Sequence, residues 1–287
     1  MKCDLHVHTT HSGMCTMPVL RRVCRESYND PAELYVTLKL RGMDLVTVTD
    51  HDSIGAAEDL RRYHDFFLSE EVTCTLPSGT KAHIGVYDIT ETQHIQLQRR
   101  RNDFYSFAAY LSEQNLFYTV NHVFSSLTGK RHAEDFLLVE EYAPGLETHN
   151  GAVHPLLNAL ASGMASRLSA PCMGGSDAHT LRGAGRTWTQ ASDARSKEEF
   201  FAQLRASRTT VHGGSGGFAK LTCDVWSIAF SMFHDQPWTL ALSPLLLLVP
   251  AFTLGAVARD LAFASYWSKW ANQHPALDHF AGNAKAT

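Results

Sequence analysis

Two histidines close to the start of the chain have a spacing that suits a metal site. His6 and His8 end a short apolar run, and because alternate side chains of a strand point to the same face, both imidazoles should point the same way. An isolated His-x-His pair is more often a surface feature. Here, however, histidines and carboxylates recur at the ends of later predicted strands: Asp50-His51, Glu71, His83, His122 and Asp177-Ala178-His179. The sequence therefore predicts that these groups converge on one place.

The ligand types indicate the chemistry. Taken singly, His51, His83 and His122 would more readily be core histidines with satisfied hydrogen bonds, but each lies at or beside a strand end. Six histidines with Glu71 and Asp177 are more ligands than one tetrahedral zinc needs, so two or three divalent ions are expected. Mixed imidazole and carboxylate ligands suit Mn, Fe or Zn better than Mg or Ca. Bridged ions can stabilise the attacking and leaving oxygens of a phosphate ester, which predicts hydrolysis of such esters.

The elements that must position these groups alternate between strand and helix signals. Asp30-Pro31-Ala32-Glu33 combines an N-cap, a first-turn proline and an early glutamate, and it predicts a helix to about Arg41. The β-branched run 44–49 predicts a buried strand, and Ser53 should cap a helix to about Tyr63. Further strands are predicted over 72–76, 83–87, 116–121 and 146–148, and further helices over 92–114, 133–142, 153–167 and 196–207.

Repeated strand–helix units predict an α/β protein with a parallel sheet. Polar residues that follow the strands are typical of a (β/α) barrel, whose active site lies at the carboxyl ends of its strands. An open doubly wound sheet is the alternative, with its site at one crevice. Ligands from at least five strands favour a closed or nearly closed ring.

The composition describes an ordinary globular protein. Of 287 residues, 44% are hydrophobic and 19% charged, and the formal net charge of −4 gives no basic field for long nucleic acid. The 16 histidines are an excess that favours metal binding. Six scattered cysteines with no Cys-x-x-Cys pair predict reduced thiols in a cytoplasmic location, and the N-terminus has no secretory signal pattern.

The C-terminal part differs in composition from the rest. The glycine-rich stretch 213–217 lacks the strand-to-helix context of a phosphate loop and predicts a hinge or linker. No charged residue occurs in 236–258, which is roughly long enough to cross a bilayer despite Pro244 and Pro250. Trp238 on one side and Tyr266, Trp267 and Trp270 on the other would suit an interfacial belt. Membrane association is one expectation, and a buried hairpin or a helix that covers the barrel is the other.

The motifs as a set resemble a known family. His6-Val-His8, Thr49-Asp50-His51-Asp52, Glu71-Val-Thr73, His83-Ile-Gly85, Asn121-His122 and Gly175-Ser176-Asp177-Ala178-His179 are similar, in order, to the motifs of the PHP (polymerase and histidinol phosphatase) domain. The resemblance spans about residues 1–212 and implies a distorted (β/α)7 TIM-like barrel there. From its composition, the rest of the chain is expected to be a linker at 213–218 and an apolar helical extension over 219–287 that could contact a membrane. The resemblance also implies metal ligation by His6, His8, His51, Glu71, His83, His122, Asp177 and His179.

The chain departs from the family pattern at one ligand. The family usually places an Asp or a His five or six residues after the second histidine, where this chain has Gly13 and Met14. His11 and Cys15 flank the gap. The chain also lacks the inserted subdomain that the small nucleotide phosphoesterases of the family carry before the histidine equivalent to His122. Loss of the ligand at Gly13 would leave activity to two ions or weaken it.

Other polar residues are expected to support the chemistry. Asp50 is predicted to act in catalysis by orienting a ligand, and otherwise to cap a helix. Glu147, which Asn150 follows, is expected to touch the substrate or a ligand. Arg131 and Arg186, together with Lys130, follow ligand-bearing loops and are the candidate cations for a substrate phosphate.

The predicted function is that of a metal-dependent hydrolase. A metal-bound hydroxide would attack phosphorus in a small phosphomonoester or a nucleotide. One alternative is a 3′–5′ exonuclease on short nucleic acid, and another is a catalytically weak metal-binding regulatory module tethered to a membrane. An amidohydrolase also begins with His-x-His, but the terminal Asp177-x-His179 disfavours it.

Overall fold

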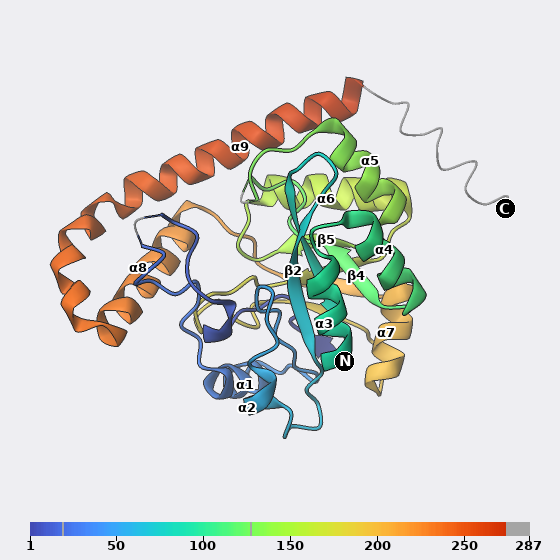
Figure 1. Ribbon diagram of the computed structural model, residues 1–287, viewed down its shortest axis with the longest axis horizontal. Helices are drawn as coiled ribbons and strands as arrows, with labels where there is room; N and C mark the ends of the chain where they lie inside the picture. Colours follow the sequence, from blue (N-terminus) through green and yellow to red (C-terminus); the bar gives the residue numbers. More distant parts are fainter. Residues whose placement is uncertain (19, 127, 274–287) are drawn as a thin grey trace, which may run out of the picture.

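The computed structural model describes residues 1–273 except for Val19 and Leu127, and its strands form two sheets (Figure 1). The first sheet has the order β1-β7-β8 and the second the order β2-β3-β4-β5-β6. The strands are β1 (Lys2–Cys3), β2 (Ser69–Thr75), β3 (Lys81–Tyr87), β4 (Phe117–Val120), β5 (Leu146–Asn150), β6 (Cys172–Gly175), β7 (Thr187–Gln190) and β8 (Thr210–Gly213). The sequence analysis did not anticipate β7 and β8.

Helices precede and follow these strands. They are η1 (Thr10–Ser12), α1 (Pro31–Leu40), α2 (Ala57–Leu60), α3 (Glu91–Arg100), α4 (Phe104–Glu113), α5 (Ala133–Tyr142), α6 (Pro155–Leu168), α7 (Lys197–Arg205), α8 (Phe218–Asp235), η2 (Pro237–Leu248) and α9 (Val249–Gln273). The α/β class is therefore as predicted. The start of α1 is also confirmed, since the Asp30 side chain accepts hydrogen bonds from the backbone of Ala32 and Glu33.

The prediction of a parallel sheet is only partly right. The β2–β3 and β3–β4 pairs are antiparallel, and β4–β5 and β5–β6 are parallel. The turn at 77–79 joins β2 to β3 as a hairpin, and a hairpin makes its two strands antiparallel. A uniform series of strand–helix units would have needed a helical crossover there.

The described strands do not form one continuous closed barrel. The expected strand at 44–49 makes only single bridges, and the strand prediction for it is wrong. Val46 bridges Phe66, and the Thr49 amide donates to the Val7 carbonyl at 2.9 Å. Val7 in turn bridges Ala178, so isolated contacts connect the two sheets at the end where the predicted ligands lie.

Two predicted helices are shorter or broken. The helix expected over 92–114 is wrong at 101–103, where α3 ends and the Asp103 carboxylate accepts from the Ser106 amide to begin α4. An interior aspartate competes with the helix for its own backbone groups and favours a new N-cap. The helix expected from Ser53 to Tyr63 is reduced to the single turn of α2.

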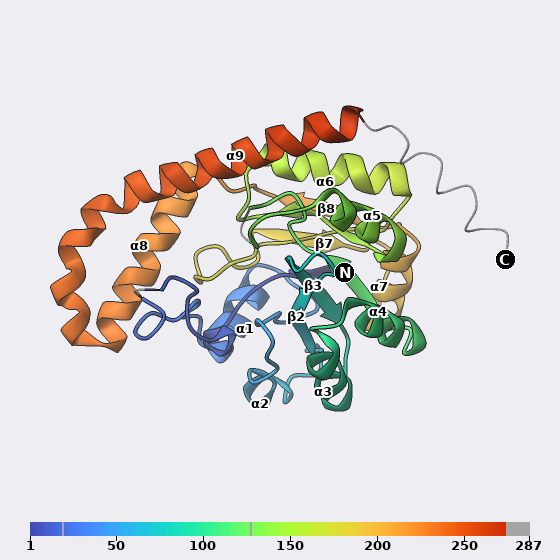
Figure 2. The same ribbon diagram turned by 45° about the horizontal axis from the view of Figure 1, so that its top comes forward.

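Helices lie on both sides of the strands (Figure 2), and apolar clusters pack between them. The largest cluster packs β2, β3 and β4 against α3, α4, α5 and α6, with Phe107 and Leu97 almost fully buried. A second cluster joins β1 to α7 through Leu5 and Phe200, and a third joins Val7 to α1 through Leu34 and Leu38. These clusters fix the frame from which the polar strand ends emerge.

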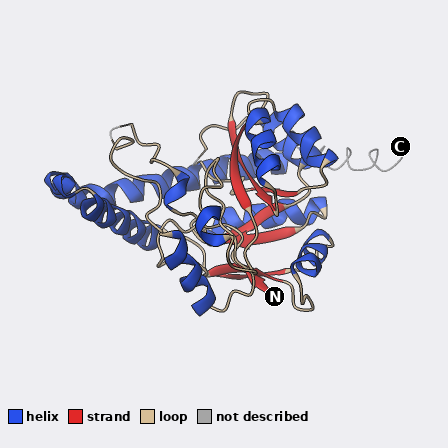
Figure 3. Cartoon of the chain, turned by 60° about the horizontal axis from the view of Figure 1, so that its bottom comes forward, coloured by secondary structure: helices blue, strands red, loops and turns tan. Residues whose placement is uncertain are grey.

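The C-terminal helices α8, η2 and α9 form an arm that projects from the body (Figures 1 and 3). The predicted glycine linker is packed where it joins the arm: the Gly216 amide donates to the Val153 carbonyl at 2.7 Å, and a Cβ on Gly216 would lie 1.9 Å from the Ala152 carbonyl oxygen. The segment Pro237–Lys269 is long and apolar enough to cross a membrane, and 6% of its most apolar window is buried.

The expected interfacial belt is wrong at Trp267. Its side chain is 6% exposed and packs on Phe136 of α5 with ring centroids 4.7 Å apart. Tyr266 is exposed, and the side chain of Trp270 lies outside the described residues. The division of the chain at 213–218 remains a prediction.

Candidate metal centre

The Glu71 carboxylate lies at the middle of a cluster of imidazoles. It enters from β2, and its Oε2 lies 3.3 Å from His6 Nε2 and 3.2 Å from His51 Nδ1. Its Oε1 lies 3.4 Å from His122 Nε2 and 3.5 Å from His83 Nδ1. One carboxylate thus faces rings from four different segments, which is the position of a bridging ligand.

Asp177 closes the other side of the cluster. Its Oδ1 lies 3.4 Å from His6 Nε2 and 3.3 Å from His8 Nε2, and 3.8 Å from His179 Nδ1. Asp177 has a φ of 49° and His122 a φ of 32°, a region that non-glycine residues rarely adopt. Such backbone geometry persists only where the surroundings hold it, and it is common at functional sites.

The structure brings all eight predicted ligands together. They form overlapping groups whose potential ligand atoms lie within 4.8 Å of one another: His6, His8 and Asp177; His6, Glu71 and His122; His51, Glu71 and His83; and His8, His51 and His179. Gly175 lets the strands approach closely, since a Cβ there would lie 2.3 Å from the His6 amide nitrogen.

Burial and charge pull the pKa values of these groups apart. Burial lowers the pKa of His83 and of His179 to about 4. Burial also opposes charge on His6, but attraction by Glu71, Asp177 and Glu147 outweighs it and raises the His6 pKa well above its usual range. The histidines in turn outweigh the burial of Glu71 and hold the pKa of that carboxyl well below its usual value.

Several buried polar atoms of the cluster have no hydrogen-bond partner among the described residues. They are Glu71 Oε2, His83 Nδ1 and His122 Nδ1. A buried polar atom without a partner costs about 1–3 kcal/mol, and three such atoms in one place therefore need an explanation. Divalent ions would use these lone pairs, and imidazole nitrogens and carboxylate oxygens are the donors such ions take. The residues present fit a metal centre.

A second layer of polar contacts holds the ligands. Glu147 of β5 accepts at Oε1 from His6 Nδ1 at 2.7 Å, and its Oε2 accepts from the His122 amide and from Asn150 Nδ2. The same Asn150 amide group donates to Asp177 at 3.0 Å. Glu147 therefore orients ligands from two separate segments, as outer carboxylates do around metal-bound histidines.

Asp50 acts on the cluster through a hydroxyl. Its fully buried carboxylate accepts from the amide and the hydroxyl of Thr9 and from Ser12 Oγ at 2.7 Å. Ser12 Oγ also contacts His8 Nδ1 at 3.0 Å. The expected orienting role of Asp50 therefore reaches His8 through Ser12 rather than His51 directly.

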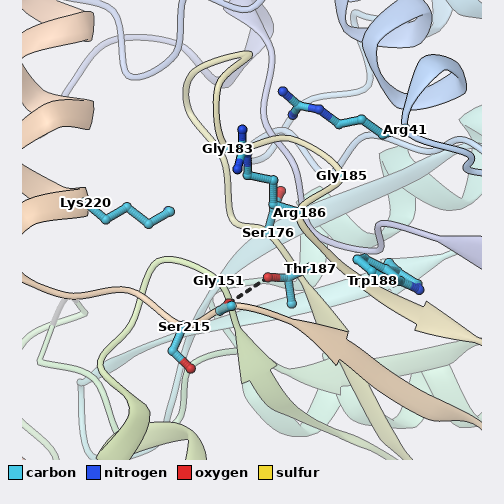
Figure 4. A pocket seen from close by; sticks show the side chains of 11 residues that line it. Arg41, Gly151, Ser176, Gly183, Gly185, Arg186, Thr187, Trp188, Ser215 and Lys220 are labelled. Carbon is cyan, nitrogen blue, oxygen red and sulfur yellow. Dashed lines mark hydrogen bonds between the residues drawn. The ribbon is translucent and has the colours of Figure 1, made fainter.

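The candidate substrate cations lie apart from the cluster. Arg131 is 8% exposed and donates to the Lys81 carbonyl and to Thr128, and burial lowers its pKa to about 10. Arg186 lines a cavity of about 500 Å³ together with Arg41, Lys220, Thr187, Trp188 and Ser215 (Figure 4). The lining includes Ser176, which precedes the ligand Asp177. The substrate roles of Arg131, Glu147 and Arg186 remain predictions.

One carboxylate near the cluster was missed by the sequence analysis. Glu26 Oε1 lies 3.6 Å from His51 Nε2, and burial raises the Glu26 pKa to about 7. Neither residue beside the gap at Gly13 takes this place: the ring of His11 lies against Gly55, and the Cys15 amide donates to the Cys24 carbonyl at 3.0 Å. No spacing in the sequence singles out Glu26, because a bridge between Met14 and Arg25 brings it there.

Comparison with known proteins finds a family match for one segment of the chain. Residues 155–209 match the family model described as PHP-associated. The uncharacterized protein MJ1587 of Methanocaldococcus jannaschii is 31% identical over 72 residues, which are 25% of this chain and 41% of that protein. The chain thus spans well under half of this relative.

The fold is shared with solved structures. A two-domain protein from Bacteroides vulgatus that contains a predicted PHP-like metal-dependent phosphoesterase is 20% identical, with a TM-score of 0.53 over 75% of this chain and 65% of that one. The lesion-specific endonuclease PfuEndoQ of Pyrococcus furiosus is 17% identical, with a TM-score of 0.50 over 73% of this chain and 57% of that one. Residues 155–209 thus match a PHP-associated segment, and the chain shares its α/β fold with these two structures.

Proposed function

We propose that the chain is a metal-dependent phosphoesterase that hydrolyses a small phosphomonoester or a nucleotide. The observation that carries this proposal is the convergence of eight ligand side chains around Glu71, with buried ligand atoms that lack partners among the described residues. The name of the Bacteroides structure, which contains a predicted metal-dependent phosphoesterase, supports the same reaction class.

This chain's own residues have distinct tasks in the proposed reaction. Glu71, which faces five histidines, and Asp177, which faces three, would hold the divalent ions together with those rings. Glu147 fixes the ring of His6, and Asp50 fixes His8 through Ser12. Divalent ions, when bound, supply Lewis acidity that activates water and stabilises charge on the phosphoryl oxygens.

The donor set favours Mn, Fe or Zn, in two or three copies. Imidazole nitrogens outnumber carboxylates, which suits these ions better than Mg or Ca. The same ring of segments is our reason to propose a distorted (β/α)7 barrel: single bridges connect Val7 to Ala178 and His51 to Glu71 where no continuous ladder does.

We propose that the substrate uses the basic cavity whose lining includes Ser176, the residue before Asp177. Arg41, Arg186 and Lys220 line it, and no acidic side chain is among the described residues that do (Figure 4). Arg41 donates to the carbonyls of Leu181 and Ala184, and Lys220 Nζ lies 3.3 Å from the Asp224 carboxylate. Arg186 is exposed, and its Nε donates to the Arg182 carbonyl, so its terminal nitrogens are our candidates for charge-assisted contacts with an anionic substrate group.

Two other functions compete with this proposal. The PfuEndoQ likeness keeps nuclease action on short nucleic acid in view, though the net charge of −4 gives no basic field for a long polymer. A regulatory module that binds metal without turnover is the other alternative. The protein is expected in the cytoplasm or at a membrane that the C-terminal arm contacts.

The test is phosphate release by metal-stripped protein with Mn, Fe(II), Zn or Mg added back, on a panel of nucleotides, phosphomonoesters and short oligonucleotides. We expect metal-dependent release that His179→Ala abolishes and that His64→Ala, at an exposed histidine outside the cluster, preserves. Release from oligonucleotides alone would favour the nuclease. No release with any metal, from protein shown to be folded, would favour the regulatory module.

A further inference from the structure

The first inference concerns a group of three histidines that contains no carboxylate. His8, His51 and His179 bring their ring nitrogens within 4.8 Å of one another, whereas each of the other groups includes Glu71 or Asp177. The rings of His8 and His51 stack with centroids 4.7 Å apart, and those of His8 and His179 at 4.4 Å. Three neutral imidazoles leave the charge of a divalent ion uncompensated.

Glu26 is placed to supply the missing carboxylate. Its Oε1 lies 3.6 Å from His51 Nε2, and its side chain is 24% exposed. The chain from Gly13 to Glu26 folds back on itself: Met14 bridges Arg25, and the Glu26 amide donates to the Gly13 carbonyl at 3.0 Å. Gly13 itself has φ 83° and ψ −150°, a backbone that disfavours any side chain there.

We propose that Glu26 is a ligand of the ion held by His8, His51 and His179. This inference rests on the proposed metal-dependent function and adds to it a residue from outside the predicted set. With Glu26 included, every histidine group of the cluster has a carboxylate beside it. The ion would then have four protein ligands, the number common for zinc and similar ions.

The test counts ions rather than turnover. After loading and gel filtration, metal analysis should find one ion fewer per chain in Glu26→Gln than in the wild type, or about a tenfold or greater loss of affinity for the most weakly held ion by calorimetry. Glu26→Asp should restore part of it. The matched control is Glu33→Gln, at an exposed glutamate of α1, which should bind as the wild type does.

The outcomes separate this inference from the function itself. An unchanged ion count and affinity in Glu26→Gln, with wild-type phosphate release intact, would overturn the ligand role alone. Absence of wild-type phosphate release would count against the function, while the ion count would still report on Glu26. Melting by circular dichroism shows whether each variant is folded.

The second inference rests on a separate observation: the arm formed by α8, η2 and α9 has its polarity reversed. Large apolar side chains of η2 and the start of α9 are exposed, with Leu247 84%, Trp238 64% and Leu254 58% exposed. The hydroxyl residues Thr222, Thr239 and Thr253 are instead 0–5% exposed. Small and hydroxyl side chains inside with Leu and Phe outside are typical of helices packed within lipid.

The buried polar groups of the arm are satisfied within it. Thr222 Oγ1 and Thr253 Oγ1 lie 2.7 Å apart across the two long helices, and Trp226 Nε1 donates to the Leu246 carbonyl at 3.1 Å. Thr239 Oγ1 donates to the Gln236 carbonyl at 2.6 Å. These polar groups of the arm therefore need no water. A segment that lies in hydrocarbon must satisfy its polar groups in this way, because no water is present there.

The exposed apolar residues do not lie on one face. Phe252 and Leu254 are two residues apart in α9, which separates them by roughly 200° around the helix. Leu245, Leu247 and Leu248 likewise point in different directions from the tighter turns of η2. A second protein would cover one side of the arm, whereas lipid surrounds it, so the observations favour lipid.

Both ends of the uncharged segment 236–258 are tied to the body. At one end Gln236 Nε2 donates to the Val23 carbonyl at 3.1 Å, and Met232 and Phe233 pack on Cys24. At the other end the Asp260 carboxylate accepts from the Ser126 amide at 2.9 Å, and Trp267 packs on Phe136. Figure 1 shows the arm leaving the body and returning to it. A segment anchored in this way enters and leaves a bilayer on the same side.

We propose that the arm inserts into one leaflet of an anionic membrane and does not span it. The segment is long enough to cross, but Gln236 and Asp260 hold both of its ends on the body. Arg21, Arg22 and Met17 are exposed, and they neighbour Leu20 and Cys24, which pack with Met232 and Phe233 of the arm. Exposed arginines next to an apolar insertion favour anionic lipid.

Vesicle binding tests the partner. The full chain should co-sediment with vesicles that contain phosphatidylglycerol and bind less to phosphatidylcholine alone. Leu247→Glu should reduce binding at least about tenfold, since a charge within hydrocarbon is strongly unfavourable. Leu40→Glu is the matched control: Leu40 on α1 is 83% exposed, close to Leu247, and its substitution should not change binding.

Topology tests the single-sided insertion. In sealed vesicles a membrane-impermeant maleimide added outside should label both His234→Cys and Ser265→Cys, which flank the segment, with the sites located by peptide mass spectrometry. Labelling of one position only would show a spanning segment and overturn the inference. A chain that ignores vesicles and forms a dimer that Leu247→Glu dissociates would instead assign the arm to a second copy.

Discussion

The metal cluster and the C-terminal arm depart from ordinary burial in opposite directions. In the cluster, charged and titratable groups are buried: Glu71 and His6 are both 0% exposed. In the arm, Leu247 and Trp238 are mostly exposed while Thr253 is 0% exposed. Buried charges and large exposed apolar surfaces are the two observations that call for a partner.

The comparison shows that each region has groups that a partner from outside the chain would satisfy: divalent ions at the cluster and lipid at the arm. In the cluster, Glu71 Oε2, His83 Nδ1 and His122 Nδ1 are buried from water without hydrogen-bond partners among the described residues, and cations would use their lone pairs. The arm exposes large apolar side chains to solvent, and lipid would cover them. The two regions are close along the chain: Cys24 packs with Met232 and Phe233 of the arm, and Glu26, two residues later, lies 3.6 Å from His51. Four measurements test this comparison, from the largest expected effect to the smallest.

Removing the charge at the centre of the cluster should have the largest effect. Glu71→Gln keeps the shape of the side chain but removes the negative charge that faces five histidines. We expect phosphate release to fall at least ~10²–10³-fold, as loss of a preorganised charged group does, with loss of bound ions. Glu70→Gln is the control, because Glu70 binds His94 and Gln98 away from the cluster. Unchanged release in Glu71→Gln would contradict the bridging role.

Substitutions at a buried and at an exposed apolar residue of the arm should differ sharply in their effect on stability. Trp267→Ala removes a ring buried against Phe136 and should lower the free energy of unfolding by about 3–5 kcal/mol. Leu247→Ala, at a side chain that is 84% exposed, should change it by less than about 0.5 kcal/mol in water. Urea unfolding measures both. Equal effects would mean that the exposed part of the arm packs on something in solution.

Loosening the groups that orient the ligands should weaken metal binding to a lesser degree. Glu147→Gln replaces a carboxylate that holds His6 at 2.7 Å and the His122 amide at 2.8 Å. We expect roughly 10–100-fold weaker metal affinity by isothermal titration calorimetry. Glu141→Gln, at an exposed position of α5, should bind metal as the wild type does. If the two variants behave alike, Glu147 does not position the ligands.

Metal affinity should rise with pH. Burial disfavours charge on His6, His8 and His122, but nearby carboxylates raise the net pKa of each, so the metal-free fold retains their protons above pH 6.5. The stabilisation from these protons is present below pH 6.5 and is lost as pH rises through the raised pKa values. Bound ions must displace the protons, so affinity should fall by up to about tenfold per pH unit for each proton as pH drops. Calorimetry in buffers of different ionisation enthalpy counts the protons released, and a count of zero would contradict this account.

Much of the site could be predicted from the sequence because its signals are local. Ligand types and their placement after strands identified all eight side chains that the structure brings together. The caps at Asp30 and Ser196 gave the starts of α1 and α7, since an N-cap depends only on its own first turn. The apolar segment 236–258 was evident from composition alone.

What the sequence could not give depends on contacts between distant segments. The antiparallel course of β2 and β3 follows from their pairing, and the failure of 44–49 to form a ladder follows from its neighbours. The place of Glu26 beside His51 requires the fold-back between Met14 and Arg25.

The sequence by itself therefore determined which groups could bind metal and which segment is apolar enough for lipid. Only the tertiary structure decided that Glu26 joins the histidines, that Trp267 is buried on α5, and that both ends of the arm return to one body. The physical reason is that residue type fixes what a side chain can bind, whereas long-range packing fixes what it meets.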